Sequence, residues 1–220
     1  MRIAGVDDAG RGPVIGPLVI AGVLIEKENL HEIVNLGVKD SKLLSPHRRE
    51  WLAKEIRKTA LQCHFIALST SEIDKVVETG RKLRKLNHLE ARAMAEVIAT
   101  LKPDIAYVDA SDVLPERYKQ HILENLPFEV QIVSEHKADA KYPIVSAASI
   151  IAKVERDKAI KELREKYGDL GSGYITDPKT VAFLEEWIKQ HGTYPEFVRK
   201  SWKPAKRIKK NMTNKQAKLI

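Results

Sequence analysis

The chain of 220 residues contains a single cysteine, Cys63, so it has no second thiol for an internal disulfide or a cysteine metal site. It also lacks a long hydrophobic run, because its longest apolar stretch, residues 17–25, is far shorter than the ~20 residues that cross a bilayer. The N-terminus leads directly into acidic residues and carries no recognisable export signal. We therefore expect a soluble cytoplasmic protein in a reducing environment, without membrane association.

Glycine and proline are sparse and scattered, with 11 and 10 residues. Apolar residues make up 43% of the chain and charged residues 31%, which argues against both fibrous and disordered classes. A chain of this length can bury a sizeable core and forms one domain, or one domain with a modest extension.

Acidic residues are absent from the last 22 positions, residues 199–220, which carry nine lysine or arginine residues. The whole chain has 38 basic and 30 acidic residues, a net charge of +8, so the segment before residue 199 is nearly neutral with 29 and 30. A basic extension on a neutral body indicates attraction to a polyanion, with nucleic acid first and an anionic membrane surface second. A solvated tail that only aids solubility is the alternative.

Hydrophobic patterning predicts a hairpin of two strands followed by strands separated by helices. Capping signals mark two helix starts, at Ser45 with Pro46 and at Asp177 with Pro178, and Gly192 marks a helix end. The pattern predicts a mixed sheet with helices on its faces, an α/β architecture, and no internal repeat is visible. The expected strands are residues 3–9, 17–25, 61–69, 105–110 and 128–135; the expected helices are residues 46–60, 71–78, 87–102, 115–126, 145–168 and 176–192, with further helix towards the C-terminus.

Four carboxylates stand at or just past the carboxyl ends of predicted strands: Asp7, Asp8, Asp109 and Asp139. Open α/β sheets bind ligands at this edge. Four acids that converge there would repel one another unless cations neutralise them, and oxygen ligands without nearby cysteine favour Mg²⁺ or Mn²⁺. Two such ions about 4 Å apart support phosphodiester cleavage. Each aspartate taken alone would be interpreted first as a strand-end cap or a turn former, and only the three places together favour a metal site.

Five segments of the chain are together similar to the ribonuclease HII family, especially to its archaeal branch. They are GVDDAGRGPVIGPLVIAG at residues 5–22, VKDSKLLS at 38–45, YVDA at 107–110, EHKADAKYPIVSAASIIAKVERD at 135–157 and GSGYITDP at 171–178. The resemblance extends from about residue 2 to residue 202, with all five segments in the same order and at compatible spacing.

The resemblance implies a ribonuclease H-like fold, with a five-stranded mixed sheet flanked by helices. Residues 1–168 would form the catalytic domain and residues 169–220 a helical C-terminal extension with the basic tail. The implied enzyme is an endonuclease that hydrolyses RNA in RNA–DNA hybrids. It also cuts duplex DNA on the 5′ side of a single embedded ribonucleotide, leaving a 3′-hydroxyl and a 5′-phosphate. Its two Mg²⁺ or Mn²⁺ ions would be held by Asp7, Asp8, Asp109 and Asp139.

One of these acids departs from the family pattern, because Asp8 occupies a position where the family has glutamate. Losing one methylene withdraws the carboxylate by roughly 1.5 Å, a large change for a metal site. An alternative function is therefore a hybrid-binding protein whose catalysis is weakened or lost through Asp8. Another nuclease of the same fold, such as a DNA resolvase or a repair endonuclease, is the second alternative.

The resemblance also implies a site that distinguishes RNA from DNA. Gly10, Arg11 and Gly12 form a turn whose backbone groups would meet a ribose 2′-hydroxyl, since glycine permits close approach. Tyr174 would pack on the sugar at the RNA–DNA junction. Without the resemblance, Tyr174 would be interpreted as a surface aromatic residue in a glycine-rich loop.

Four further residues are expected to contact the substrate. Ser41 and Lys42 resemble a phosphate contact, and His136 and Lys137 would face the nucleic acid backbone or the leaving group. The alternatives are a solvated lysine and a hydrogen-bonded loop histidine.

The C-terminal heptapeptide, NKQAKLI, begins like the glutamine-led peptide with which some relatives bind the sliding clamp. Gln216 and Leu219 match that pattern, but the closing aromatic pair is absent. We expect at most a weak clamp contact through this tail, and a monomeric protein.

Overall fold

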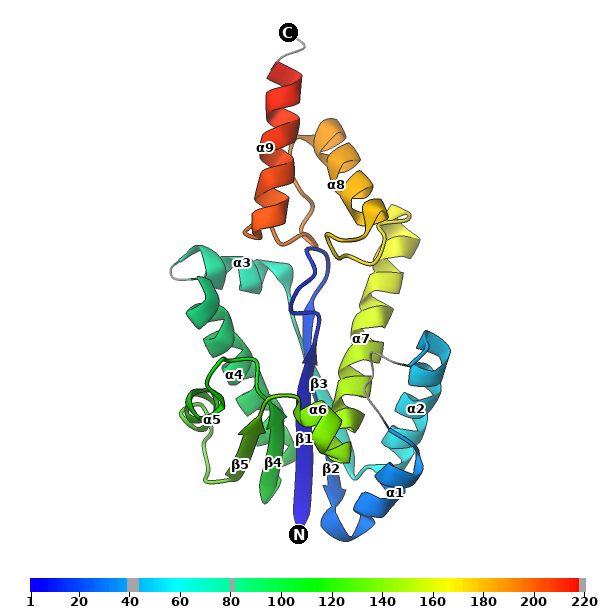
Figure 1. Cartoon of the computed structure of the whole chain (residues 1–220), viewed down its shortest axis with the longest axis vertical. Coiled ribbons are helices and arrows are strands. Elements are labelled where there is room, and N and C mark those ends of the chain that lie inside the picture. The colour runs from blue at the N-terminus through cyan, green and yellow to red at the C-terminus, as the bar shows by residue number, and fades with distance from the viewer. Residues whose placement is uncertain (39–43, 80–81, 218–220) are drawn as a thin grey trace. The chain divides into compact units, whose positions relative to one another are not determined.

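The computed structural model describes residues 1–38, 44–79 and 82–217 (Figure 1). The described strands form one mixed sheet in the order β3-β2-β1-β4-β5. Strand β1 is antiparallel to β2 and parallel to β4, which is parallel to β5. This topology confirms the predicted fold class. The strand bounds are Arg2–Ala9 for β1, Leu18–Glu26 for β2, Gln62–Leu68 for β3, Ile105–Asp109 for β4 and Gln131–Glu135 for β5.

The predicted helices are present, and three short elements were not predicted: the 3₁₀ turn η1, α1 and α6. No helix in the described part of the chain is both long and apolar enough to cross a membrane. The helical bounds are Lys27–Asn29 for η1, Leu30–Asn35 for α1, Pro46–Thr59 for α2, Thr70–Glu78 for α3, Lys82–Leu101 for α4, Pro115–Leu123 for α5, Ala138–Lys141 for α6, Pro143–Tyr167 for α7, Pro178–His191 for α8 and Lys203–Ala217 for α9.

Helix boundaries follow the capping signals. The Ser45 hydroxyl accepts a hydrogen bond from the Arg48 amide at 3.2 Å, at the start of α2. The Asp177 carboxylate accepts one from the Lys179 amide at 3.0 Å and caps α8 in the same way. Helix α8 ends at Gly192, whose φ of 70° is left-handed.

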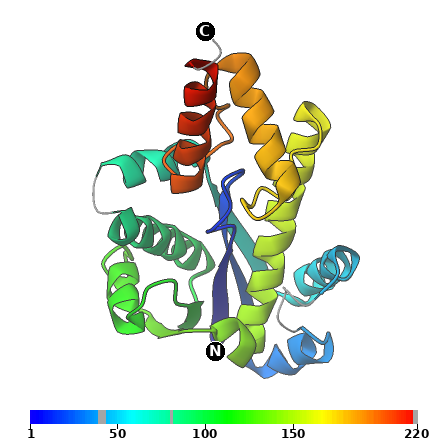
Figure 2. The ribbon, with the colours of Figure 1, turned by 45° about the horizontal axis from the view of Figure 1, so that its top comes forward.

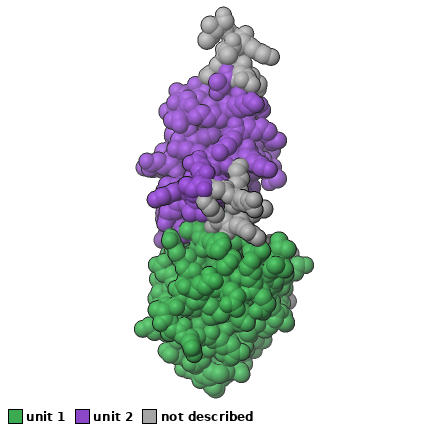
Figure 3. All heavy atoms as spheres, turned by 90° about the vertical axis from the view of Figure 1, so that its left-hand side faces the viewer, with its two compact units in different colours: residues 1–9, 19–67, 83–155 green, residues 10–18, 68–82, 156–220 purple. Residues whose placement is uncertain are grey.

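Two compact units make up the chain, coloured separately in Figure 3. Unit 1 comprises residues 1–9, 19–67 and 83–155, and unit 2 comprises residues 10–18, 68–82 and 156–220. Each unit has its own cluster of buried apolar side chains. The expected domain boundary at residue 168 stays a prediction.

In unit 1, helices cover both faces of the sheet, because two glycines let them approach closely. A Cβ at Gly5 would overlap the Ile144 carbonyl of α7, and a Cβ at Gly22 would lie 2.6 Å from Leu101 of α4. Gly5 pairs with Val23 and Gly22 pairs with Val6, so the two glycines point to opposite faces. Figures 1 and 2 accordingly show α4 on one side of the sheet and the first half of α7 on the other.

Unit 2 is built around the segment between β1 and β2. Val14 and Ile15 of this segment are buried together with Ile160 of α7 and Leu184 of α8. An isolated antiparallel bridge joins Ile15 to Val198. The segment that carries the GRG motif is therefore packed against residues from the C-terminal third of the chain.

Candidate active site

The parallel strands β1 and β4 bring their carboxylates to one edge of the sheet. Val6 pairs with Val108, and the next residues along the two strands are Asp7 and Asp109. Asp8 follows Asp7 near the end of β1, and Asp109 is the last residue of β4. The predicted position of these three acids, at the carboxyl ends of strands, agrees with the structure.

Asp7 is the buried member of this group, with 4% of its surface exposed. Burial raises its pKa well above the ordinary value, and the neighbouring charges of Asp8 and then Asp109 raise it further. Hydrogen bonds from the Ser149 side chain and from the Asp8 amide, the latter at 2.7 Å, act in the opposite direction. Three carboxylates thus share one electrostatic environment, where a positive charge would be stabilising.

Asp139 lies on α6, the four-residue helix that follows β5. The Ala138 amide at the start of α6 donates to Asp109 Oδ1 at 2.7 Å, which links this helix to the end of β4. Asp139 is 7% exposed, and its backbone carbonyl accepts a hydrogen bond from Ser146 Oγ at 2.6 Å. The chain at Asp139 is therefore fixed beside Asp109.

The donor set fits a hard divalent cation, because every member is a carboxylate. Within residues 1–38, 44–79 and 82–217, however, no group of three or more histidine, cysteine, aspartate or glutamate side chains is close enough to hold a metal ion.

Ser111 contacts the site but was not singled out from the sequence. Its hydroxyl donates to Asp8 Oδ1 at 3.0 Å. The available signal was its place two residues after Asp109, on the loop that leaves the carboxyl end of β4.

The neighbouring residues His136 and Lys137 have structural roles at the same edge. The two ring nitrogens of His136 lie 3.3 Å from the Ala110 carbonyl and 3.2 Å from the Val113 carbonyl. Lys137 has a left-handed backbone, with φ of 56°, and immediately precedes α6. Both side chains are exposed, and their contact with nucleic acid stays a prediction.

The predicted recognition residues come together in unit 2. A Cβ on Gly12 would lie 3.6 Å from Cε1 of Tyr174, so the Tyr174 ring lies against the GRG turn. The amides of Val14 and Ile15 both donate to the Gly173 carbonyl, at 2.8 and 3.2 Å. These bonds join the segment that follows the GRG turn to the GSGY loop, two parts of the chain that are distant in the sequence.

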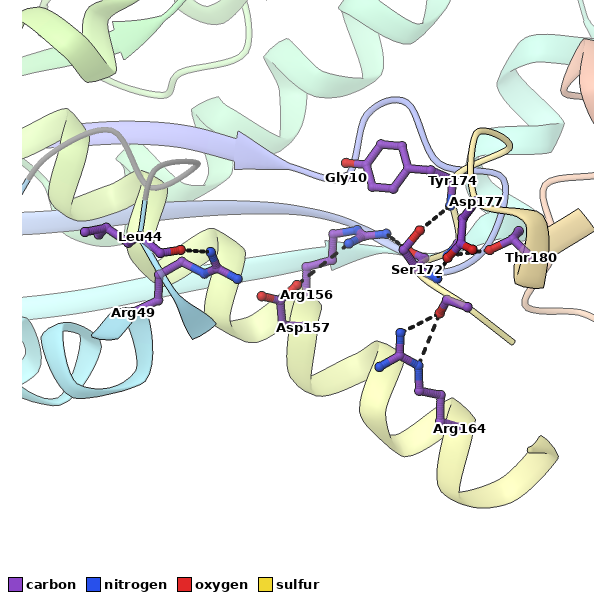
Figure 4. Close-up of polar contacts among 12 residues, drawn as sticks. Gly10, Leu44, Arg49, Arg156, Asp157, Arg164, Ser172, Tyr174, Asp177 and Thr180 are labelled. Carbon is purple, nitrogen blue, oxygen red and sulfur yellow. Dashed lines mark hydrogen bonds and ion pairs between the residues drawn. The ribbon is translucent and has the colours of Figure 1, made fainter. Parts of the chain in front are cut away.

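Arg156 of α7 supports both motifs and is 2% exposed (Figure 4). Its guanidinium donates to the Ser172 carbonyl at 3.3 Å and lies 5.2 Å from the centroid of the Tyr174 ring. Gly10 has a φ of 95°, and a Cβ there would lie 2.6 Å from the Arg156 side chain and 2.7 Å from the Pro17 carbonyl. Only glycine fits this position of the turn.

Arg199 corrects the interpretation of the basic C-terminal segment. Its side chain is fully buried and donates to three backbone carbonyls: Gly10 at 2.6 Å, Arg11 at 2.9 Å and Gly16 at 3.0 Å. It therefore belongs to the interior of unit 2 and is not available to a polyanion.

Helix α9 contains most of the remaining tail charges. Ala205 and Ile208 of this helix are buried in unit 2. Five basic side chains of α9 are exposed: Lys203, Lys206, Arg207, Lys209 and Lys210. The helix is amphipathic, so its charged face remains open while its apolar face stabilises the fold.

Some predicted contacts lie outside the described residues, namely Ser41, Lys42 and Leu219. Gln216 lies within α9. The roles of these residues in phosphate or clamp binding stay predictions.

The sequence is similar to known proteins of one family over almost its whole length. The family model for ribonuclease HII matches residues 4–205. The chain is 46% identical to a ribonuclease HII of Pyrococcus abyssi over 218 residues, which covers 98% of this chain and 95% of the relative.

Two solved structures are similar as well. A ribonuclease H2 from Pyrococcus horikoshii has 44% identity and a TM-score of 0.89, with 97% of this chain and 99% of that chain covered. A ribonuclease HII from Archaeoglobus fulgidus, solved as a complex with PCNA, has 47% identity and a TM-score of 0.83, with 94% and 96% covered.

Proposed function

The chain belongs to the ribonuclease HII family and is a ribonuclease H, a nuclease of the hydrolase class, and from this premise we propose its substrates and products. It hydrolyses RNA strands paired with DNA, and it also cuts duplex DNA on the 5′ side of a single embedded ribonucleotide. Both reactions leave a 3′-hydroxyl and a 5′-phosphate. The observation that carries this proposal is the buried Asp7 carboxylate, which shares the sheet edge with Asp8 and Asp109.

We propose that Asp7, Asp8, Asp109 and Asp139 hold two divalent cations, Mg²⁺ or Mn²⁺. When bound, such ions make a water nucleophilic and stabilise the charge on the departing 3′-oxygen. The burial of Asp7 supports its central place among the ligands, because an isolated buried carboxylate is costly without a positive partner. The bond from the Ala138 amide fixes the orientation of the Asp109 carboxylate before any ligand arrives.

Recognition of RNA is assigned to the turn of Gly10, Arg11 and Gly12 together with Tyr174. The carbonyls of Gly10 and Arg11 accept hydrogen bonds from Arg199, so the turn is rigid before substrate arrives. A rigid turn without side chains at its two glycines lets a ribose 2′-hydroxyl approach the backbone closely. The Tyr174 ring, adjacent to Gly12, would then pack on the sugar at the junction.

The deciding experiment uses a DNA duplex that carries one ribonucleotide, incubated with the protein and either Mg²⁺ or Mn²⁺. The proposal predicts a single cut on the 5′ side of the ribonucleotide, mapped by end-labelling, and no cut with Asp7→Asn. A matched DNA-only duplex is the control for the substrate.

The two alternatives give different results in that experiment. Cleavage of the DNA-only duplex would favour another nuclease of the same fold. Binding of the ribonucleotide duplex without cleavage in either metal would favour a hybrid-binding protein whose catalysis is lost through Asp8, and Asp8→Glu would then restore the cut.

A weak contact with a sliding clamp is a separate proposal. It is supported by the complex that the Archaeoglobus fulgidus relative forms with PCNA, and by the glutamine-led sequence around Gln216. We propose that the chain acts as a monomer and that the extreme C-terminus makes this contact. Titration of labelled chain with the clamp, compared with Gln216→Ala, tests it, and equal affinities would contradict it.

A further inference from the structure

The loop of residues 110–114, between β4 and α5, is anchored by a buried carboxylate. Asp112 is 2% exposed and accepts hydrogen bonds from Asn87 Nδ2 at 2.7 Å, from the Leu114 amide at 2.9 Å and from the guanidinium of Arg117. Burial acts to raise the pKa of Asp112, but these hydrogen bonds and the Arg117 charge outweigh it and hold the pKa well below the ordinary value. Asp112 therefore stays ionised, and its hydrogen bonds hold the loop in place.

A second set of contacts fixes the loop to the end of β5. The Ala110 amide donates to the Glu135 carbonyl at 2.9 Å. The His136 ring lies within 3.3 Å of the Ala110 carbonyl and 3.2 Å of the Val113 carbonyl. Val113 itself is 84% exposed, so the loop owes its shape to these polar contacts and not to apolar packing of its tip.

Ser111 lies between these anchors, immediately before Asp112, and its hydroxyl donates to Asp8 Oδ1 at 3.0 Å. Asp8 is adjacent to Asp7 and raises the pKa of Asp7, because the two negative charges repel each other. Repulsion of this kind turns a free carboxylate away from its neighbour, whereas a hydroxyl donor from a rigid loop opposes that rotation.

We propose that Ser111 is a positioning residue for the Asp8 carboxylate, through the loop that Asp112 and His136 anchor. Ser111 holds Asp8 beside Asp7 for cation binding, and it does not itself contact the substrate. This inference rests on the proposed function only in taking Asp8 as a cation ligand, so its primary test measures cation binding and not cleavage.

The experiment compares Mn²⁺ binding by the full chain, followed by electron paramagnetic resonance or calorimetry, for the unmodified protein and three variants. Ser111→Ala is expected to weaken binding about 10-fold, the lower end of what loss of a hydrogen bond to a metal ligand costs. Ser111→Thr retains the hydroxyl, so its Mn²⁺ affinity should lie within about twofold of that of the unmodified chain.

Ser134→Ala is the matched control. Ser134 is a buried serine on β5 in the same unit, and among the described residues its hydroxyl has no hydrogen-bond partner. Its removal should leave Mn²⁺ affinity unchanged. Equal affinities for Ser111→Ala and Ser134→Ala would overturn the proposal.

A double-mutant cycle with Asp8→Glu separates positioning from a general loss of structure. The longer glutamate places its carboxylate beyond the point that the Ser111 hydroxyl reaches, so Ser111→Ala should cost clearly less in the Asp8→Glu background. The same loss in both backgrounds would contradict a role through Asp8.

Cleavage of the ribonucleotide duplex provides the second readout. A positioning role predicts a lower kcat for Ser111→Ala with an unchanged KM. If the unmodified chain binds Mn²⁺ in a Ser111-dependent manner but cuts nothing, the proposed function fails and this inference stands. If the unmodified chain binds no Mn²⁺, both fail.

Discussion

The guanidinium of Arg156 lies 5.2 Å from the centroid of the Tyr174 ring, and the same side chain fills the space that a Cβ on Gly10 would need. One buried arginine thus supports the aromatic residue and the glycine turn that are assigned to RNA recognition. The Tyr174 ring therefore contacts a side chain of helix α7. Substituting Tyr174 and measuring cleavage of each substrate therefore tests what the ring contributes to each reaction.

Tyr174→Ala should lower cleavage at a single ribonucleotide about tenfold, equivalent to ~1.4 kcal/mol, and should affect long hybrids less. A continuous RNA strand offers many alternative registers, whereas a single ribonucleotide offers one. The measurement is the ratio of kcat/KM for the two substrates, with Tyr174→Phe as the control that keeps the ring. Equal losses on both substrates would mean that Tyr174 is only a packing residue.

Asp7→Asn should abolish cleavage and yet raise the thermal stability of the metal-free protein. The folded pKa of Asp7 lies above its unfolded value, so the ionised form costs stability once the pH rises above the ordinary value of 3.8. Asparagine removes that charge at similar size. Unfolding temperatures at pH 7 in a chelator test this, and a lower value for Asp7→Asn would contradict the electrostatic description of the site.

Arg199→Met should destabilise the protein by ~3 kcal/mol or more, because three backbone carbonyls, two of them in buried residues, lose donors that each contribute about 1–3 kcal/mol. Arg199→Lys retains the charge but not the fork geometry of the guanidinium. Its free energy of unfolding should lie between those of the unmodified protein and Arg199→Met. Urea denaturation measures the change. Arg207→Met, on the exposed face of α9, is the matched control, and a similar loss for both arginines would contradict the buried role of Arg199.

Substituting Lys206, Arg207 and Lys210 together by glutamine should weaken hybrid binding and reduce its salt dependence. Each lost phosphate contact lowers the logarithmic slope by ~0.9, because fewer counterions are released. Substitution is preferable to truncation, since deleting α9 would also remove Ala205 and Ile208 from the core. The cut position should not move. Lys58→Gln, on α2, is the control for the loss of a positive charge elsewhere. If the triple variant has the same slope as this control and the unmodified protein, the tail is solvated and makes no phosphate contact.

The stability of the protein should fall as the pH drops below 6.5, owing to a pair of adjacent histidines. The ring centroids of His88 and His121 lie 3.8 Å apart, and the ring planes are tilted by 30°. Burial lowers the pKa of His121, and the charge of His88 lowers it further. The unfolded chain therefore binds a proton at higher pH than the folded chain does, and stability is lost as the pH falls from 6.5 through the lowered pKa.

His121→Gln should reduce this acid sensitivity, by at most about 1.4 kcal/mol for each pH unit. The measurement is urea denaturation at pH 7.5 and pH 5.0 for both proteins. Carboxylates such as Asp112 contribute equally to both and cancel in the comparison. An identical pH dependence would contradict the assignment to this pair.

The sequence carried enough information to predict the sheet and the position of three site acids. Alternating strands and helices set the direction of β4 and β5, and Asp7 and Asp109 then had to share one edge. Local capping chemistry predicted the helix starts at Ser45 and Asp177. Helix α6 was missed because four residues are too few to display helical periodicity.

Contacts between side chains and distant backbone could not be predicted. The three carbonyls that bind Arg199 belong to a segment near the N-terminus. Every residue has a backbone carbonyl, so the sequence does not indicate which of them accept a hydrogen bond from a distant side chain. Counting charges therefore assigned Arg199 to the tail. Ser111 was missed for a similar reason, since its hydroxyl contacts Asp8, which lies 103 residues earlier in the chain.

The bond between Arg199 and the Gly10 carbonyl spans 189 residues, which has a consequence for the order of events during synthesis. Translation proceeds at roughly 5–20 residues per second, so the turn is synthesised about 10 to 40 seconds before its supporting arginine. A nascent or prematurely terminated chain thus has β1 and its acids but an unsupported turn. Selective recognition of RNA would be acquired last, when the chain is nearly complete.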